Sequence, residues 1–184
     1  MKKGLLLFFL FPLTLFAKVG QDGDFQIWNE NVVNLKLDPK VTFAISNEYR
    51  WGDNASKIYY KHLQGKLLCK VSPRLSLHPG YLMMWFRASN KWVIVYEPLF
   101  EFTVQLLKNQ YVEVKNRNRV GYNVIPGVFG GKNAWSYRNR THFHIPVTIH
   151  GYQFKLFVGD EIFFLQGRGF SQNRVMGGGD ASAK

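Results

Sequence analysis

Residues 135–149 read WSYRNRTHFHIPVTI, and their pattern decides the fold class of this chain. Apolar side chains recur there with a period of two, at Trp135, Tyr137, Phe143, Ile145, Val147 and Ile149. The alternate positions carry polar side chains, at Ser136, Arg138, Arg140, His142, His144 and Thr148. A period of two is typical of a β-strand whose two faces meet different surroundings. The stretch therefore predicts a strand with one apolar face and one polar face.

The same alternation recurs in residues 41–51 and 92–106. Their polar faces include four charged residues, Glu48, Arg50, Glu97 and Glu101. Further candidate strands cover residues 24–37, 57–71, 74–86, 110–122 and 152–165, with a ninth near Phe170. Helical spacing does not recur after residue 24, so the sequence predicts an all-β chain. We expect one domain from residue 18 to residue 184.

Most of the candidate strands are 12 to 15 residues long, whereas ordinary globular strands have about five or six residues. Such lengths suit strands that cross a membrane at a tilt in about 9 to 11 residues. We therefore expect an antiparallel up-and-down β-barrel of about eight to ten strands. Residues 175–184 are rich in glycine and show no alternation, so we expect the barrel to be incomplete at its C-terminus.

Three prolines, Pro79, Pro98 and Pro146, fall inside candidate strands. Each predicts a bulge, a strand edge or a misplaced boundary, because proline cannot donate to the ladder. Asn116 and Asn118 share a face with valines in segment 110–122, and amides are costly to place against lipid tails.

The first 17 residues have the zones of a secretory signal. Lys2 and Lys3 precede an apolar run from Leu5 to Phe16, which Ala17 ends. We expect export and cleavage after Ala17; an uncleaved anchor is the alternative, although its 12 apolar residues fall short of the roughly 20 that a spanning helix needs. Loss of the two lysines lowers the formal net charge from +12 to +10. The mean hydropathy of −0.17 and the lack of a second long apolar run exclude a helical membrane protein.

Alternation alone does not say what covers the apolar face. A soluble barrel buries that face, whereas an outer-membrane barrel turns it toward lipid and encloses the polar face. Aromatic residues gather near strand ends, at Tyr49, Trp51, Tyr81, Trp85, Trp92, Trp135 and Tyr137, which suits the headgroup level of a membrane. We therefore expect a polar lumen lined by Glu48, Arg50, Glu97, Glu101, Arg138, Arg140, His142 and His144.

Four short segments resemble a bacterial family called domain of unknown function 2490. They are Asp24–Trp28, Asn47–Trp51, Tyr137–Arg140 and Phe170–Arg174, and the similarity spans roughly residues 24 to 176. The resemblance implies an exported barrel and supplies no catalytic residues. Family members continue with further strands where this chain has its glycine tract, which also puts barrel closure in question.

Two constellations on the polar faces have a chemical and a structural interpretation. His142 and His144 point the same way on a strand and can share a metal, but no third ligand is near in sequence, so we expect structural histidines and no metal or other cofactor. Ser136, His142 and Glu97 offer the residue types of a hydrolase triad. No Gly-x-Ser-x-Gly elbow is present, and we expect no enzyme.

The arginines of the polar faces are Arg50, Arg117, Arg119, Arg138 and Arg140. They can form an anion-selective lining, or they can pair with Glu48, Glu97, Glu101 and Glu113. A barrel of about eight strands has an interior only just wide enough for its own side chains, which favours pairing.

The basic charge indicates an anionic partner. Because no Lys/Arg-rich run or recognition module is present, we expect membrane lipid, lipopolysaccharide or a small acidic solute rather than nucleic acid. The sequence therefore predicts a structural, binding or narrow transport protein of a Gram-negative outer membrane. The alternatives are a soluble periplasmic barrel that binds a lipid in an apolar interior, and an outer-membrane lipid-modifying hydrolase.

Overall fold

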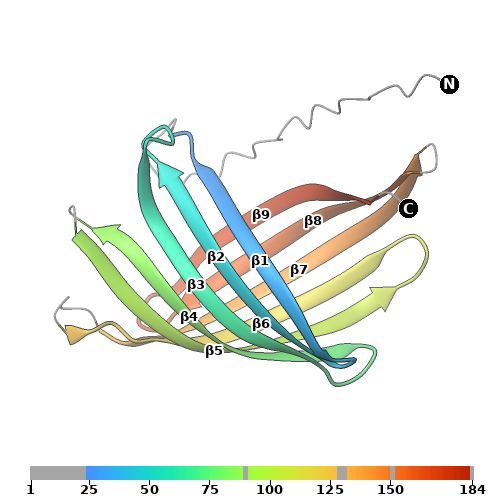
Figure 1. Cartoon of the computed structure of the whole chain (residues 1–184), viewed down its shortest axis with the longest axis horizontal. Coiled ribbons are helices and arrows are strands. Elements are labelled where there is room, and N and C mark those ends of the chain that lie inside the picture. The colour runs from blue at the N-terminus through green and yellow to red at the C-terminus, as the bar shows by residue number, and fades with distance from the viewer. Residues whose placement is uncertain (1–23, 89–90, 128–131, 150–151, 183–184) are drawn as a thin grey trace.

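The computed structural model describes residues 24–88, 91–127, 132–149 and 152–182, in which nine strands form one sheet. The strands are β1 (Ile27–Asp38), β2 (Val41–Gly52), β3 (Lys57–Lys70), β4 (Leu75–Ala88), β5 (Lys91–Lys108), β6 (Glu113–Asn123), β7 (Ala134–Ile149), β8 (Tyr152–Leu165) and β9 (Gly169–Ser182). Each strand pairs antiparallel with the next one along the chain (Figure 1). The predicted all-β, up-and-down architecture is confirmed; the predicted signal in residues 1–17 lies outside the described residues.

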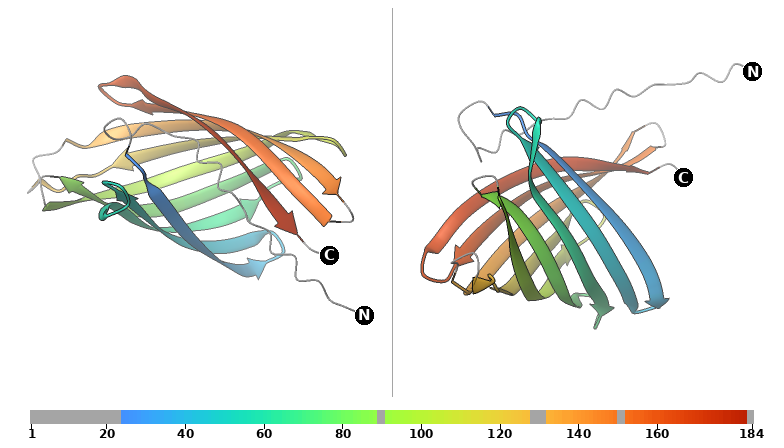
Figure 2. Two further views of the ribbon diagram at one scale, coloured as in Figure 1. Left: turned by 90° about the horizontal axis from the view of Figure 1, so that it is seen from above. Right: turned by 60° about the vertical axis from the view of Figure 1, so that its left-hand side comes forward.

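The sheet curls into a half-barrel whose two open edges are β1 and β9 (Figure 2). Among the described residues no ladder joins these edge strands, in agreement with the expected incomplete barrel. Because the strand number is odd, β1 and β9 run in the same direction. No helix in the described ranges is long and apolar enough to cross a membrane.

The two faces of the curled sheet differ in chemistry. Side chains converge on the concave face, where Ser136 on β7 reaches across β6 to Glu97 on β5. Glu97 and Glu101 on this face are 0 % exposed. The convex face carries apolar residues, and Phe100 and Phe143 there are 45 % and 44 % exposed. The alternation in the sequence therefore places polar side chains inside the curl and apolar side chains outside it.

A small apolar cluster interrupts the polar concave face over β3, β4 and β5. Its buried members are Tyr60, Leu82, Met84, Val95 and Leu99. This cluster is the hydrophobic core of the described chain, and it is small because most apolar residues point outward.

The convex face is aromatic at the end of the half-barrel where β2–β3, β4–β5, β6–β7 and β8–β9 are connected. The rings of Tyr122 and Trp135 lie 4.8 Å apart there. Lys61 Nζ lies 4.9 Å from the ring centre of Trp92 and 5.5 Å from that of Trp85. Trp85, Trp92 and Trp135 thus lie at one end of the sheet as predicted, whereas Tyr81 lies in the middle of β4.

The three strand prolines lie where a ladder is interrupted or has ended. Pairing between β3 and β4 has a gap at Pro79, and the β5–β6 ladder stops just short of Pro98. Pro146 lies beyond the last residue of β7 that pairs with β6. Local gaps and a strand edge, without a bulge, therefore accommodate the missing proline N–H groups.

Strand β6 begins later than predicted because a turn occupies residues 109–112. The side-chain Oδ1 of Asn109 accepts hydrogen bonds from the backbone N–H groups of Tyr111 and Val112, each at 2.9 Å. Such local bonds favour a turn over a strand.

Residues 175–184 show no strand pattern in the sequence, but the part up to Ser182 belongs to β9, which includes the glycine tract. Gly177–Gly179 pair with β8. A Cβ on Gly178 would lie 2.9 Å from Cε1 of Phe157, so side chains of β8 fill the space that the glycines leave. A strand of this kind shows no alternation in the sequence.

Candidate functional site

The candidate site is the charged concave face of the half-barrel. All eight predicted lining residues lie on it: Glu48, Arg50, Glu97, Glu101, Arg138, Arg140, His142 and His144. The structure distributes them over separate groups. Their role as a lumen lining stays a prediction.

The first group lies on β2 and β3. Arg50 Nε donates a short hydrogen bond to Glu48 Oε1, and His62 Nδ1 lies 3.2 Å from the other carboxylate oxygen. The Arg50 guanidinium also lies over the rings of Trp28 and Tyr60, at 4.1 Å and 4.4 Å. This arginine is therefore fixed by a carboxylate and two aromatic rings, as the pairing interpretation predicts.

The second group centres on Glu101 of β5. Its Oε1 accepts hydrogen bonds from Nε and Nη2 of Arg119 at 3.0 Å and 2.6 Å. Lys66 Nζ lies 3.8 Å from the same oxygen, and Arg117 Nη1 lies 3.5 Å from Oε2. One buried carboxylate thus serves three cations.

The third group centres on Glu161 of β8, which is 1 % exposed. Arg140 Nη2 lies 2.8 Å from Oε1 and donates to Oε2 at 2.9 Å. Arg174 Nη1 lies 3.7 Å from Oε2. Arg140 therefore pairs with a carboxylate that we did not predict.

Glu97 takes a neutral partner. Its Oε1 accepts a hydrogen bond from Ser136 Oγ at 2.9 Å. A Cβ added to Gly121 would lie 1.9 Å from the same oxygen, so the carboxylate lies directly over the glycine backbone. Because glycine has no Cβ, the Glu97 carboxylate can occupy this space on the concave face.

Arg138 is the exception among the predicted arginines. Its guanidinium lies 5.0 Å from the ring centre of Phe163, and the Arg174 guanidinium lies 5.1 Å from the same ring. Among the described residues, no carboxylate forms a salt bridge or hydrogen bond with Arg138. The prediction that Glu97 pairs with an arginine is also wrong: among the described residues Ser136 donates to its Oε1, and its Oε2 is buried without a hydrogen-bond partner.

Glu113 pairs with lysines instead of arginines. Lys155 Nζ donates to its Oε2 at 2.6 Å, and Lys115 Nζ lies 2.9 Å from Oε1. The pairing interpretation is therefore right for the glutamate and wrong for its partners.

The two histidines of β7 lie side by side. The rings of His142 and His144 are 5.6 Å apart, and His142 stacks on Phe157. His142 Nε2 lies 3.4 Å from Met176 Sδ. In the described ranges no group of three or more His, Cys, Asp or Glu is arranged to hold a metal ion.

The residues of the hydrolase alternative do not come together. Ser136 and His142 are six positions apart on β7, which at about 3.3 Å per residue separates them by about 20 Å. Ser136 bonds Glu97, whereas His142 contacts Phe157. This geometry provides no relay from serine to histidine.

Sequence reasoning missed Glu161, Arg174 and Lys66 as members of the charged face. Glu161 lies in a segment that we predicted as a strand, and it pairs in register with Arg140. The alternation within 152–165 was the available signal, but the register between strands was needed to assign the partner.

A polar cluster also lies on the convex face of β6 and β7. Asn118 Oδ1 accepts hydrogen bonds from Tyr137 Oη at 2.6 Å and from Asn139 Nδ2 at 2.7 Å. Asn116 Nδ2 donates to Asn139 Oδ1 at 3.1 Å and to Thr141 Oγ1 at 3.0 Å. The amides that we expected to be costly on this face therefore satisfy one another.

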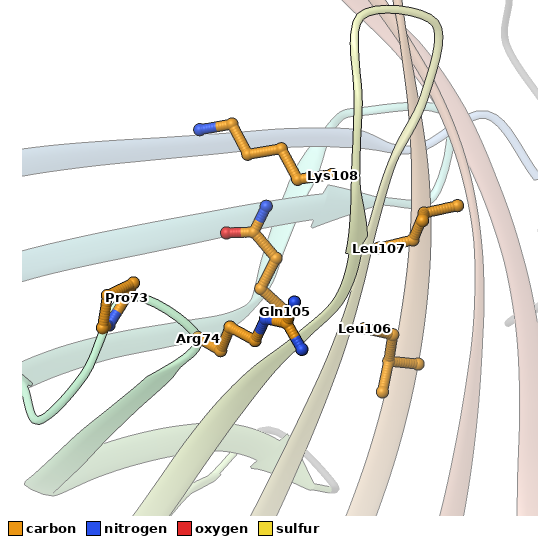
Figure 3. Close-up of a pocket in the computed structure, with 6 residues that line it drawn as sticks. All are labelled: Pro73, Arg74, Gln105, Leu106, Leu107 and Lys108. Atoms are coloured by element: carbon orange, nitrogen blue, oxygen red, sulfur yellow. The ribbon is translucent and has the colours of Figure 1, made fainter.

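A shallow pocket lies at the rim where β3–β4 and β5–β6 are connected (Figure 3). It is lined by Pro73, Arg74, Gln105, Leu106, Leu107 and Lys108. The backbone N–H of Gln105 donates to the Arg74 carbonyl at 2.8 Å and so joins β5 to the segment just before β4. Arg74 and Lys108 are exposed, so the rim presents positive charge to the solvent.

The fold and the charged face define a class: antiparallel up-and-down half-barrels with a polar concave face and an apolar convex face. The chain belongs to the family described as protein of unknown function (DUF2490), whose model matches residues 25–183. The family resemblance found in the sequence is thus confirmed. Comparison with curated proteins and with solved structures gives no match.

Proposed function

We propose that this chain is a β-barrel protein of a Gram-negative outer membrane, with a structural, binding or narrow transport role. The observation that carries the proposal is the direction of the side chains. Charged residues gather on the concave face, and large apolar residues cover the convex face. Such a distribution of side chains is stable when lipid surrounds the barrel and water fills its interior.

Three further features support a membrane. The strands are 11 to 18 residues long, enough to cross the hydrocarbon layer at a tilt. Aromatic rings gather at one end of the convex face, where Lys61 extends between Trp85 and Trp92, as a cation does at the headgroup level. The amide cluster around Asn118 satisfies its own hydrogen bonds, which lowers the cost of placing it against lipid.

Anionic lipid, including lipopolysaccharide, is the partner that we propose for the outside of the protein. The chain has a formal net charge of +12, and its rim exposes Lys40, Lys70, Arg74 and Lys108. A basic rim next to a membrane attracts anionic headgroups.

The two rival functions are less well supported. A soluble lipid-binding barrel needs an apolar interior, but the concave face holds three carboxylates that are almost fully buried among cations. A hydrolase needs a converging triad, and Ser136 is held by Glu97 at a distance from His142. We therefore propose a role without catalysis.

Cell fractionation tests the proposal. We expect the protein in the outer-membrane fraction, with extraction that requires detergent and with heat-modifiable migration on a gel. Release of the folded protein by osmotic shock would contradict the membrane assignment and support the soluble barrel. Lipid hydrolysis by the purified protein that is lost in Ser136→Ala would support the hydrolase.

A further inference from the structure

Four arginines form a compact group on the concave face of β6 and β7. Arg119 pairs in register with Arg138, and Arg117 pairs in register with Arg140. We name these four residues the arginine block. Directly opposed residues on one face of an antiparallel pair have Cβ atoms about 5 Å apart, and like charges at such positions destabilise the sheet.

The carboxylates around the arginine block do not balance its charge. Two further cations, Lys66 and Arg174, share its carboxylates. Glu101 serves three of the six cations, Glu161 serves two, and Glu97 bonds Ser136. Six cations against three carboxylates leave an excess of three positive charges.

Hydrogen-bond donors in the block and beside it also lack acceptors. The Nε atoms of Arg140 and Arg174 are buried and donate no hydrogen bond to the described residues. Arg138 contacts the ring of Phe163 and pairs with no carboxylate of the described chain. A ring on one side of a guanidinium fixes its plane while leaving its N–H edge free to donate.

The block can be reached from the solvent on the concave side. The side chains of Arg117 and Arg140 are 28 % and 23 % exposed, and Arg138 is half-buried. A group of guanidinium donors that is partly shielded and reachable matches an anion with several acceptor oxygens.

We infer that the arginine block, with Arg138 as its free donor, is a binding site for a phosphate-type oxyanion. This inference specifies the ligand of the proposed binding or transport role and rests on that role. The phosphate can belong to a free solute or to a lipid headgroup. In both cases the oxyanion supplies negative charge beyond that of the three carboxylates of the face, and its oxygens can accept from the guanidinium N–H groups that no carboxylate reaches.

Titration calorimetry of the detergent-folded full chain tests the site. The probes are inorganic phosphate and dihexanoyl phosphatidic acid, with dihexanoylglycerol as the lipid without phosphate. We expect saturable binding of a phosphate probe that weakens at least about tenfold in Arg138→Gln, because one charged hydrogen-bond donor is lost. Lys57→Gln removes the same charge from an exposed surface pair, and we expect its affinity to stay within about twofold of the natural protein.

Arg138→Lys keeps the charge and loses the planar fork, so we expect an affinity between those of the natural protein and Arg138→Gln. Binding of inorganic phosphate identifies a free-solute site, and binding of phosphatidic acid alone identifies a headgroup site. The inference would be overturned if neither probe binds. It would also be overturned if the natural protein, Arg138→Gln and Arg138→Lys bind a phosphate probe with equal affinity.

The outcome is separable from that of the proposed function. A protein that needs detergent for extraction but binds neither probe contradicts the oxyanion site alone. A protein released by osmotic shock contradicts the membrane assignment, whatever it binds.

Discussion

Strands β6 and β7 carry opposed polar side chains on both faces, and the two sets are satisfied differently. On the convex face Asn118 lies opposite Asn139, and their amides bond each other. On the concave face Arg119 lies opposite Arg138, and the carboxylate that binds Arg119 belongs to another strand. A neutral cluster can complete its hydrogen bonds locally, whereas a charged block needs partners from elsewhere. The convex polar cluster is therefore complete within β6 and β7, whereas the concave arginines depend on carboxylates of β5 and β8.

The largest expected effect is on the concave face, in Glu101→Gln. The change leaves Lys66, Arg117 and Arg119 without their shared carboxylate, and we expect a loss of about 3–5 kcal/mol in the free energy of unfolding. Urea unfolding in lipid vesicles, followed by tryptophan fluorescence, measures it. The matched control is Asp53→Asn, in an exposed pair with Lys57, for which we expect no measurable loss of stability. Equal losses in the two variants would mean that the concave face is as hydrated as the surface.

Phe143→Arg tests the convex face. Phe143 is exposed near the middle of β7. The proposed membrane location puts this position against lipid, and we therefore expect an arginine there to destabilise the protein in vesicles by about 2–4 kcal/mol. Phe143→Leu keeps an apolar side chain and should cost less than about 1.5 kcal/mol. An arginine variant as stable as the leucine variant would show that water, not lipid, covers this face.

Gly121→Ala tests the close approach of Glu97 to the backbone. The added Cβ would lie 1.9 Å from Glu97 Oε1, so the carboxylate must move, and we expect a loss of about 1–3 kcal/mol in the same unfolding assay. Gly127→Ala is the control, because a Cβ there meets nothing within 4 Å. If the two alanine variants unfold at the same urea concentration, Glu97 does not need the space over Gly121.

The smallest expected effect is that of Asn118→Leu in the convex amide cluster. The change removes the acceptor of Tyr137 and Asn139, and we expect a loss of about 1 kcal/mol. Asn173→Leu replaces an exposed asparagine of β9, and we expect it to be neutral or stabilising in vesicles. If Asn118→Leu is neutral and Asn173→Leu is destabilising, the hydrogen bonds of Asn118 do not stabilise the protein and the exposed amide of Asn173 does.

Sequence alternation predicted both faces because side chains of a strand point to opposite sides whatever the neighbouring strands are. It therefore placed Glu48, Glu97 and Arg138 on the concave face. Their partners could not be predicted, since pairing depends on the register between strands, which the turn lengths set. A ninth strand was expected near Phe170, but its extension to Ser182 was missed because Gly177–Gly179 have no side chains to alternate.

The central proposal is that lipid covers the convex face, and nitroxide labels on β7 test it most directly. In a Cys69→Ala background, single cysteines at 143 and 145 are labelled and compared with single cysteines at 142 and 144, with the protein in lipid vesicles. We predict that labels at 143 and 145 collide mainly with oxygen, which concentrates in lipid, and that labels at 142 and 144 collide mainly with a water-soluble nickel complex. Nickel accessibility at 143 and 145 equal to that at 142 and 144 would show that water, not lipid, covers the convex face.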